Sequence, residues 1–539
     1  MYRLNGLFIG ANGKSVFLKL LLINILVVVV CYTMLGVNYA TDDDMIMVWI
    51  SSGCFLGRPD MHLVFANVIY GFVVAGLYKV IPSVEWYTLC LIGFQVVSFS
   101  IVQKRIIGMN RGTIGTTLFL VAILLIELSL LHSLTFTTTA GIMATASFLE
   151  IGEKTKNGYA IGMILFLLAS MVRFSSAMLV GLVFLSFYPL CFYLNGFSRQ
   201  QFVCLSFCVV LAIGFKVIDR MVYRLDDGWE NYYQTNKARS GINDHVDVWR
   251  AKSDLPNSVI ESDLDLLFLF GFRDAHVFDN QSLVSIHETM DKLTSYKSIP
   301  YIKKVKNVFG FLREYLLYWV SIIPLVSIVL ITITGGDKRR LLCGVPIIAL
   351  LVITSFVAMT YIVKERAFLC AYLPFVLYLS FLVFNPGQSK KEQVWLGVAL
   401  LLSVMPMIKW HSLRLSGRPS DNNTEQLVNY IHENDLKPVL LCWPFDENAM
   451  KVSSNYFDYL SNGWTFDMPG RLQIDKLSDF VEDKKIVIIG GDENSMNLYF
   501  DKLKTSILFH YGLEVAPKML KTFDNYVIYA IVEDNANSI

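Results

Sequence analysis

The apolar residues of this chain are grouped into long runs, and this constrains its fold more than any other feature. The runs are roughly 17 to 25 residues long, the length that an α-helix needs to cross the hydrocarbon of a bilayer. The 539-residue chain is 54% hydrophobic with a mean hydropathy of +0.49, and 17% of its residues are charged. Soluble domains carry about 25% charged residues. We therefore expect a polytopic α-helical membrane protein.

About eleven transmembrane helices are expected, at residues 15–36, 86–102, 113–132, 138–152, 158–173, 175–195, 202–219, 314–333, 341–360, 367–385 and 394–410. A further apolar segment, residues 62–78, lies between Pro59 and Pro82. The excess of Lys and Arg in short cytoplasmic loops decides whether it crosses.

If residues 62–78 do not cross and the N-terminus is cytoplasmic, most of the basic loop residues fall inside: Lys104, Arg105, Arg111, Lys154, Lys156, Arg199, Lys338, Arg339, Arg340, Lys390 and Lys391. The short outside loops beyond the first then hold only Arg173, Lys364 and Arg366. The opposite assignment inverts the bias. We therefore expect a cytoplasmic N-terminus and a helix at 62–78 lying in the outer interface. The large outer loops, together with the absence of a eukaryotic targeting signal, favour a bacterial plasma (inner) membrane.

This topology sends three segments outward: residues 37–85, residues 220–313 and a soluble tail of residues 411–539. The chain thus divides into a transmembrane module, 1–410, and an extracytoplasmic domain, 411–539. Short runs rich in β-branched residues predict strands in the tail, and helical patterns lie between them. The tail is expected to be an α/β domain with strands at 439–443, 485–490 and 526–532 and helices at 424–433 and 494–504.

Several classes of function have no support in the sequence. The net charge is +1, which gives no basis for nucleic-acid binding. The nine cysteines include no Cys-x-x-Cys, so neither a zinc site nor a disulfide framework is indicated. There is no P-loop, and no Gly-x-Ser-x-Gly motif. The expected spans also lack the buried charges and paired broken helices of an ion-coupled transporter, and the nearest exceptions are Lys216 and Asp219 near the outer end of one span.

Three consecutive carboxylates, Asp42, Asp43 and Asp44, follow the first apolar run. Adjacent negative charges raise the cost of ionising all three groups, which suits a general base for a hydroxyl proton. We expect a helix to begin near Met45, with Asp42 as its cap and with Asp43 and Asp44 facing a pocket. The alternative is a solvated turn that ends the first span.

A second polar group, Arg58, Asp60 and His62, follows one short helix later, at the start of the interfacial segment. Asp60 at a helix start is as often a cap as a ligand. The functional interpretation is that this turn folds back over the Asp cluster, so that the three side chains help to line one pocket.

The outward cations Arg173, Lys364 and Arg366 stand at the outer ends of expected spans. They could snorkel to the membrane surface or contact lipid headgroups. Alternatively they bind phosphate, since Arg presents a rigid fork of donors to phosphate oxygens and Lys adds a point charge. Cations facing carboxylates across an outer cavity suit an anionic, lipid-linked substrate.

With these features the chain resembles the GT-C superfamily of membrane glycosyltransferases that use polyprenyl-phosphate-linked sugars. The matching features are a first span leading into Asp42-Asp43-Asp44, a shallow helix near 62–78 before the second span, a multi-span body and an outward C-terminal domain. The triple Asp departs from the more usual acidic pair of that family.

The resemblance implies that Asp43 or Asp44 acts as base toward the acceptor and that Arg366, Lys364 and Arg173 hold the lipid phosphate. It implies an inverting transfer of a sugar from a polyprenyl phosphate to a glycan, lipid-linked or other cell-envelope acceptor. It leaves open a divalent cation, Mg or Mn, and implies no other cofactor. Two other functions remain open: a transporter or flippase for a lipid-linked glycan, and a non-catalytic envelope assembly protein.

Overall fold

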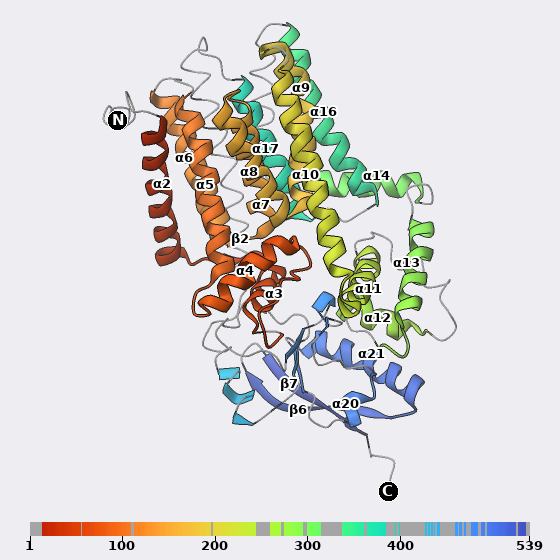
Figure 1. The fold of residues 1–539 in the computed structure, drawn as a ribbon. Helices are drawn as coiled ribbons and strands as arrows, with labels where there is room; N and C mark the ends of the chain where they lie inside the picture. The colour runs from red at the N-terminus through yellow and green to blue at the C-terminus, as the bar shows by residue number, and fades with distance from the viewer. Residues whose placement is uncertain are drawn as a thin grey trace.

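A computed structural model of the chain forms a helical bundle with a mixed α/β unit at one end (Figure 1). The structure describes residues 13–54, 56–108, 113–195, 198–243, 259–270, 274–294, 299–313, 337–360 and 364–383, and then residues 394, 398, 426, 427, 429–431, 433, 434, 436, 439–441, 459–461, 463–465, 468, 469, 476–482, 487–490, 493–523 and 526–534.

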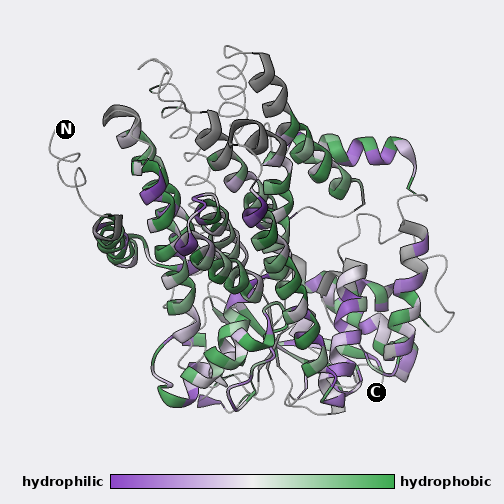
Figure 2. Ribbon diagram, turned by 45° about the horizontal axis from the view of Figure 1, so that its top comes forward, coloured by the Kyte–Doolittle hydropathy of each residue, from purple (hydrophilic) through white to green (hydrophobic). Residues whose placement is uncertain are grey.

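The described bundle helices are α2 (Gly13–Val30, continued by η1, Cys31–Leu35), α5 (Trp86–Gly108), α6 (Thr113–His132), α7 (Phe136–Ile151), α8 (Lys156–Val172), α9 (Phe174–Asn195), α10 (Arg199–Tyr223), α16 (Asp337–Thr360) and α17 (Glu365–Val383). They run side by side, and their residues are largely apolar (Figure 2). Nine of the predicted spans coincide with these helices. The predicted span 314–333 and nearly all of the span 394–410 lie outside the described residues.

Three described segments are long and apolar enough to cross a membrane by length and composition: Ser15–Leu35, Trp86–Gly108 and Arg199–Tyr223. Other apolar helices are shorter, among them Lys156–Val172. The structure thus supports a membrane protein, while the count of eleven spans stays a prediction.

The first outward segment forms two helices, α3 (Asp42–Ser52) and α4 (Val68–Val80). Both lie across one end of the bundle rather than along it (Figure 1). Asn67 caps α4 through its own side chain, and the Asp219 carboxylate of α10 accepts the Val68 N–H at 2.9 Å. The apolar segment predicted at 62–78 is therefore a helix of 13 residues, short of the roughly 20 that a span needs.

The second outward segment contains α11 (Asp227–Asn243), α12 (Glu261–Phe270), α13 (Asn280–Thr294) and α14 (Tyr301–Phe311). The tail holds a five-stranded sheet of order β4-β3-β5-β7-β6. Its strands are β3 (Val439–Leu441), β4 (Tyr459–Ser461), β5 (Val487–Gly490), β6 (Val515–Phe523) and β7 (Tyr526–Glu533). β4, β3 and β5 are parallel to one another, and β7 runs antiparallel to both of its neighbours, β5 and β6.

The predicted tail strands correspond to β3, β5 and β7. Two strands were not predicted: β4, and the edge strand β6, in which Pro517 and three lysines or threonines alternate with apolar residues. A helix, α21 (Glu493–Tyr511), packs its buried residues on the sheet and extends the predicted 494–504 in both directions. Of the predicted helix 424–433, residues 426, 427, 429–431 and 433 are described, and they are helical.

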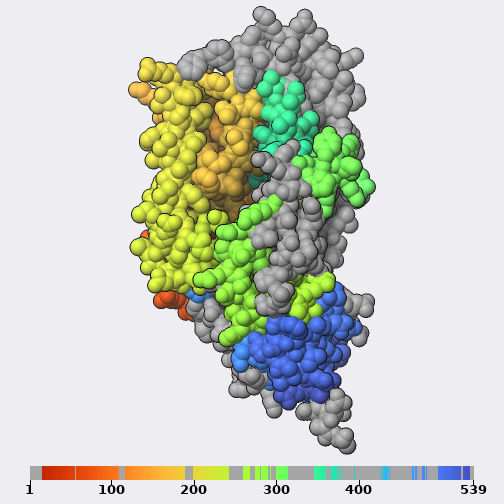
Figure 3. All heavy atoms as spheres, turned by 90° about the vertical axis from the view of Figure 1, so that its right-hand side faces the viewer, coloured from red at the N-terminus to blue at the C-terminus, as the bar shows by residue number. Residues whose placement is uncertain are grey.

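The tail and the second outward segment are tied together by side chains (Figure 3). Asp263 accepts from His510 at 2.8 Å, and Asp274 accepts from Tyr511 at 2.7 Å and from the Leu477 N–H at 2.9 Å. Leu266 of α12 belongs to the hydrophobic core of the tail. The acidic residues of this segment therefore hold the tail in place.

One buried carboxyl group inside an expected span was not predicted. Glu127 of α6 is fully buried, and Gln103 of α5 donates to it at 3.3 Å. Gln103 also donates to Asn24 of α2 at 3.0 Å. Elsewhere Lys104 pairs with Glu150 at 3.1 Å. One carboxyl group hardly changes the mean hydropathy of a long apolar run, so a hydropathy profile does not reveal it. Its polar partners lie on neighbouring helices.

Candidate active site

The three aspartates form the first turn of α3, and Thr41 is the residue that precedes the helix. The prediction that Asp42 caps a helix beginning near Met45 is therefore wrong, because the helix begins three residues earlier. Consecutive helical residues point about 100° apart, which follows from 3.6 residues per turn. The three carboxylates consequently have different surroundings: Asp42 is exposed, Asp43 is half-buried and Asp44 is fully buried.

Asp44 joins three helices, α3, α5 and α7, by hydrogen bonds. Its carboxylate accepts the Tyr87 O–H of α5 at 3.0 Å, the Phe136 N–H of α7 at 2.9 Å and the Thr41 O–H at 3.1 Å. Burial raises the pKa of Asp44 to about 7, against the lowering effect of the hydrogen bonds from Phe136, Thr135 and Tyr87. With no exposed surface and its oxygens bonded to fixed donors, Asp44 cannot contact a substrate.

Asp43 has the opposite environment. Its side chain is 18% exposed, and among the residues that the structure describes each of its oxygens has one donor. Arg366 of α17 donates to Oδ2 at 2.7 Å, and the Trp464 indole N–H of the tail donates to Oδ1 at 3.0 Å. A carboxylate oxygen has two lone pairs, so each oxygen keeps one available. Asp43 is therefore the aspartate of the pair that can accept a proton from a bound molecule.

Arg173, at the end of α8, adds a second cation beside Asp43. Its guanidinium lies over the rings of Phe65 and Phe136, 5.2 and 5.0 Å from their centroids. It lies within electrostatic range of both Arg366 and Asp43. Its hydrogen bond to the Phe65 carbonyl is 3.5 Å long, and its buried Nε has no hydrogen-bond partner among the described residues. Arg173 thus keeps donors available for an anion.

Asp60 and His62 form a separate pair. The imidazole Nδ1 lies 2.7 Å from Asp60 Oδ1, which also accepts the His62 N–H at 2.8 Å. Burial would raise the pKa of Asp60, but the hydrogen bonds from His62 and the nearby charge of Arg58 outweigh it and lower that pKa. The imidazole stacks on Trp229 of α11, with centroids 4.4 Å apart.

The contacts described for Asp60 and His62 join the first outward segment to α11 and include none with Asp43. Arg58 is exposed at the turn. The predicted convergence of these three residues on the Asp cluster is therefore not seen among the described residues. Lys364 is exposed immediately before α17, two positions from Arg366. The structure thus brings together Asp43, Arg366 and Arg173 out of the nine predicted site residues.

Trp464 belongs to this site and was missed. It lies in the 3-10 turn η5 (Gly463–Thr465) of the tail, 421 positions from Asp43. No local motif marks an aromatic residue for such a contact, so the sequence carried no signal for it. Asp43 thus lies where the first outward segment, α17 and the tail meet.

Two solved structures of one protein align with the chain along most of its length. They are ArnT from Cupriavidus metallidurans in the apo state and ArnT from the same organism bound to undecaprenyl phosphate. The TM-scores are 0.43 and 0.40 and the sequence identities 11% and 10%; each alignment covers 95% of this chain and 97% of the other. No protein-family model matches the chain, and no curated protein does. Scores this low place the chain in no family.

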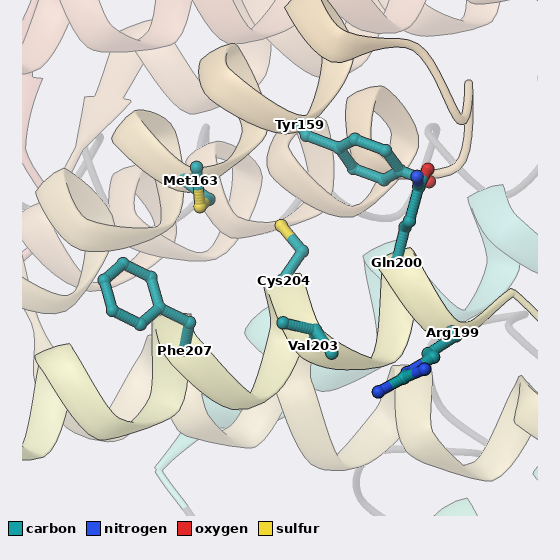
Figure 4. Close-up of a pocket in the computed structure, with 7 residues that line it drawn as sticks. All are labelled: Tyr159, Met163, Arg199, Gln200, Val203, Cys204 and Phe207. Carbon is teal, nitrogen blue, oxygen red and sulfur yellow. The ribbon is translucent and has the colours of Figure 1, made fainter.

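An apolar groove of about 370 Å³ lies between α8 and α10. Its lining comes from Tyr159, Met163, Arg199, Gln200, Val203, Cys204 and Phe207. Tyr159 and Gln200 approach each other, whereas Arg199 points away (Figure 4). These residues belong to the N-terminal halves of the two helices, and the other ends of α8 and α10 carry Arg173 and Asp219. The groove is therefore distinct from the candidate site.

Proposed function

We propose that this chain is a membrane glycosyltransferase of the GT-C type, which transfers a sugar from a polyprenyl phosphate to an extracytoplasmic acceptor. The observation that carries the proposal is the arrangement of Asp43, Arg366 and Arg173: one partly exposed carboxylate beside two cations. A base next to an anion-binding group is what hydroxyl attack on a phosphate-linked sugar needs.

Asp43 is the proposed base. Its free lone pair accepts the proton of the acceptor hydroxyl as that oxygen bonds to the anomeric carbon of the donor. The bond between that carbon and the phosphate oxygen breaks on the opposite face, and its electron pair leaves with the polyprenyl phosphate. The configuration at the anomeric carbon is thereby inverted.

Arg366 and Arg173 are proposed to stabilise the departing phosphate. Negative charge develops on the leaving oxygen, and preorganised donors there lower the barrier most. Arg173 lies over the rings of Phe65 and Phe136, so it is oriented before the substrate arrives. Lys364, exposed beside Arg366, is proposed to attract the anionic headgroup.

A divalent cation does not fit the two inner carboxylates. The Asp43 oxygens face Arg366 and Trp464, and those of Asp44 face three protein donors. Among the residues that the structure describes, no three His, Cys, Asp or Glu side chains form a metal-binding group. The proposed reaction therefore has no step through Mg or Mn.

The proposed site faces the outside of the plasma membrane. Tyr87 at the start of α5 contacts Asp44, and Lys104 near its other end pairs with Glu150. These positions are about 25 Å apart along the helix, close to the thickness of the hydrocarbon. Because the basic loops collect at the Lys104 end, the positive-inside rule assigns Asp43 and the tail to the outside.

The test compares Asp43→Asn with Asp44→Asn at matched expression, by mass spectrometry of polyprenyl-linked sugars and surface glycans. Asn at position 43 cannot accept the proton, so the sugar should be missing from the glycan and the polyprenyl-phosphate sugar should accumulate. Asn at position 44 can still accept from Tyr87 and Phe136 and donate to Thr41, so transfer should continue.

Wild-type glycans from the Asp43→Asn cells would contradict the proposal. An unchanged mass of every glycan, together with a changed distribution of lipid-linked glycan across the membrane, would instead identify a flippase. Activity that depends on the tail but not on Asp43 would identify an assembly protein.

A further inference from the structure

We propose that Trp464 is a positioning residue for Asp43, so that the tail completes the active site of the transmembrane module. This inference rests on the proposed function, because it assigns a role to a partner of the proposed base. It concerns one hydrogen bond, from the Trp464 indole N–H to Asp43 Oδ1.

The first reason is that, without the Trp464 hydrogen bond, the carboxylate of Asp43 could adopt other orientations. An aspartate in the first turn of a helix can bend back to accept the N–H groups of that turn, as capping residues do. Arg366 holds only Oδ2. When Trp464 also donates to Oδ1, two donors from two other elements fix the plane of the carboxylate. The remaining lone pairs of its oxygens then point in fixed directions.

The second reason is that Trp464 is itself held firmly. Its residue is 9% exposed, and its backbone carbonyl accepts the Tyr232 O–H of α11 at 2.7 Å. Its ring meets the edge of Phe65, with centroids 4.8 Å apart. Phe65 in turn lies against Arg173. The tail turn therefore touches the proposed base directly and the proposed phosphate ligand through one ring.

The contacts of Trp464 provide a matched pair of variants. Trp464→Phe removes the N–H donor to Asp43 and keeps an aromatic ring in place. Tyr232→Phe removes the other hydrogen bond of the same residue, the bond to its carbonyl, and touches no proposed catalytic group. Both variants weaken the attachment of the tail turn, but only Trp464→Phe releases Asp43.

The rate is measured as the initial loss of the polyprenyl-phosphate sugar in host membranes, by mass spectrometry. A hydrogen bond to a charged group corresponds to a rate factor of about tenfold or more. We expect Trp464→Phe to lower the rate by about that factor and Tyr232→Phe to stay within about twofold of wild type. Trp464→His, which restores an N–H donor, should recover part of the rate.

An equal loss in Trp464→Phe and Tyr232→Phe would overturn the proposal, because tail attachment alone would explain it. A Trp464→Phe rate equal to or above wild type would also overturn it, since the contact would then be irrelevant or obstructive.

A second measurement separates this inference from the proposed function. Thermal unfolding of the purified full-length protein is followed for Trp464→Phe, Asp43→Ala and the double variant, because alanine, unlike asparagine, removes the acceptor of the Trp464 N–H. A double variant less destabilised than the sum of the two singles shows that the side chains are coupled. Additive effects would overturn the positioning role. An Asp43→Asn protein with the wild-type rate would overturn the proposed function, whether or not the pair is coupled.

Discussion

The burial of Asp44 leads to a pH dependence of stability that an Asn at the same position should abolish. The pKa of this carboxyl is about 7 in the folded chain, against an ordinary value of 3.8. The folded chain therefore binds the proton more tightly than the unfolded chain. Its stabilising contribution is full below about pH 4 and is lost as the pH rises to about 7.

The magnitude follows from the size of the shift. One pKa unit corresponds to about 1.4 kcal/mol, so a shift of about three units corresponds to roughly 4 kcal/mol between the two limits. The amide introduced by Asp44→Asn would not titrate, and it reproduces the hydrogen bonds of the protonated acid. Its oxygen accepts from Tyr87 and Phe136, and its NH₂ group donates to Thr41.

The assay is thermal unfolding of wild type and Asp44→Asn in detergent from pH 4.5 to 8. The two midpoints should lie closest at the acid end, and the variant should unfold several degrees above wild type at pH 8. Other titrating groups affect both proteins equally and cancel in the difference. A difference between midpoints that does not change with pH would refute the reasoning and show that Asp44 is not buried in this way.

Three further outcomes are expected. Arg366→Gln should lower sugar transfer by about 10²-fold, because one preorganised donor is lost, measured as accumulation of the polyprenyl-phosphate sugar; an unaffected rate would remove Arg366 from the site. Asp219→Ala should cost roughly 2 kcal/mol in thermal unfolding, since the Val68 N–H loses its acceptor; an unchanged midpoint would mean that this hydrogen bond adds no stability to α4. Asp274→Ala should speed proteolytic release of the tail by removing the acceptor for Leu477 and Tyr511; equal cleavage of wild type and variant would count against this anchor.

The helical bundle was largely predictable because its signal is local. A run of apolar residues reports a buried or membrane-spanning helix without reference to any distant residue. A short helix was predicted at 62–78 from the balance of Lys and Arg in the loops and from the flanking prolines, and the structure has one at 68–80. Short strands such as β4 carry little local signal, because a strand of three residues is defined by its neighbours in the sheet.

The candidate site was predictable only in its residue types. The sequence supplied three carboxylates after the first apolar run and cations at Arg173 and Arg366. It did not reveal that Asp44 is buried against Tyr87 and Phe136 while Asp43 stays accessible. Which of the two carboxylates is buried depends on where the first turn of α3 begins. A shift of the helix start by three residues redirects every side chain of that turn by most of a revolution.

By itself, then, the sequence determined the class of protein: apolar runs must be buried in lipid or in one another, and the charged residues between them must lie at the surfaces. The tertiary structure decided which carboxylate meets Arg366 and that Trp464 reaches it from the tail. Hydropathy is a property of each residue, so it can be read from any short stretch of the sequence. A hydrogen bond between residues 43 and 464 exists only once the bundle and the tail have packed together.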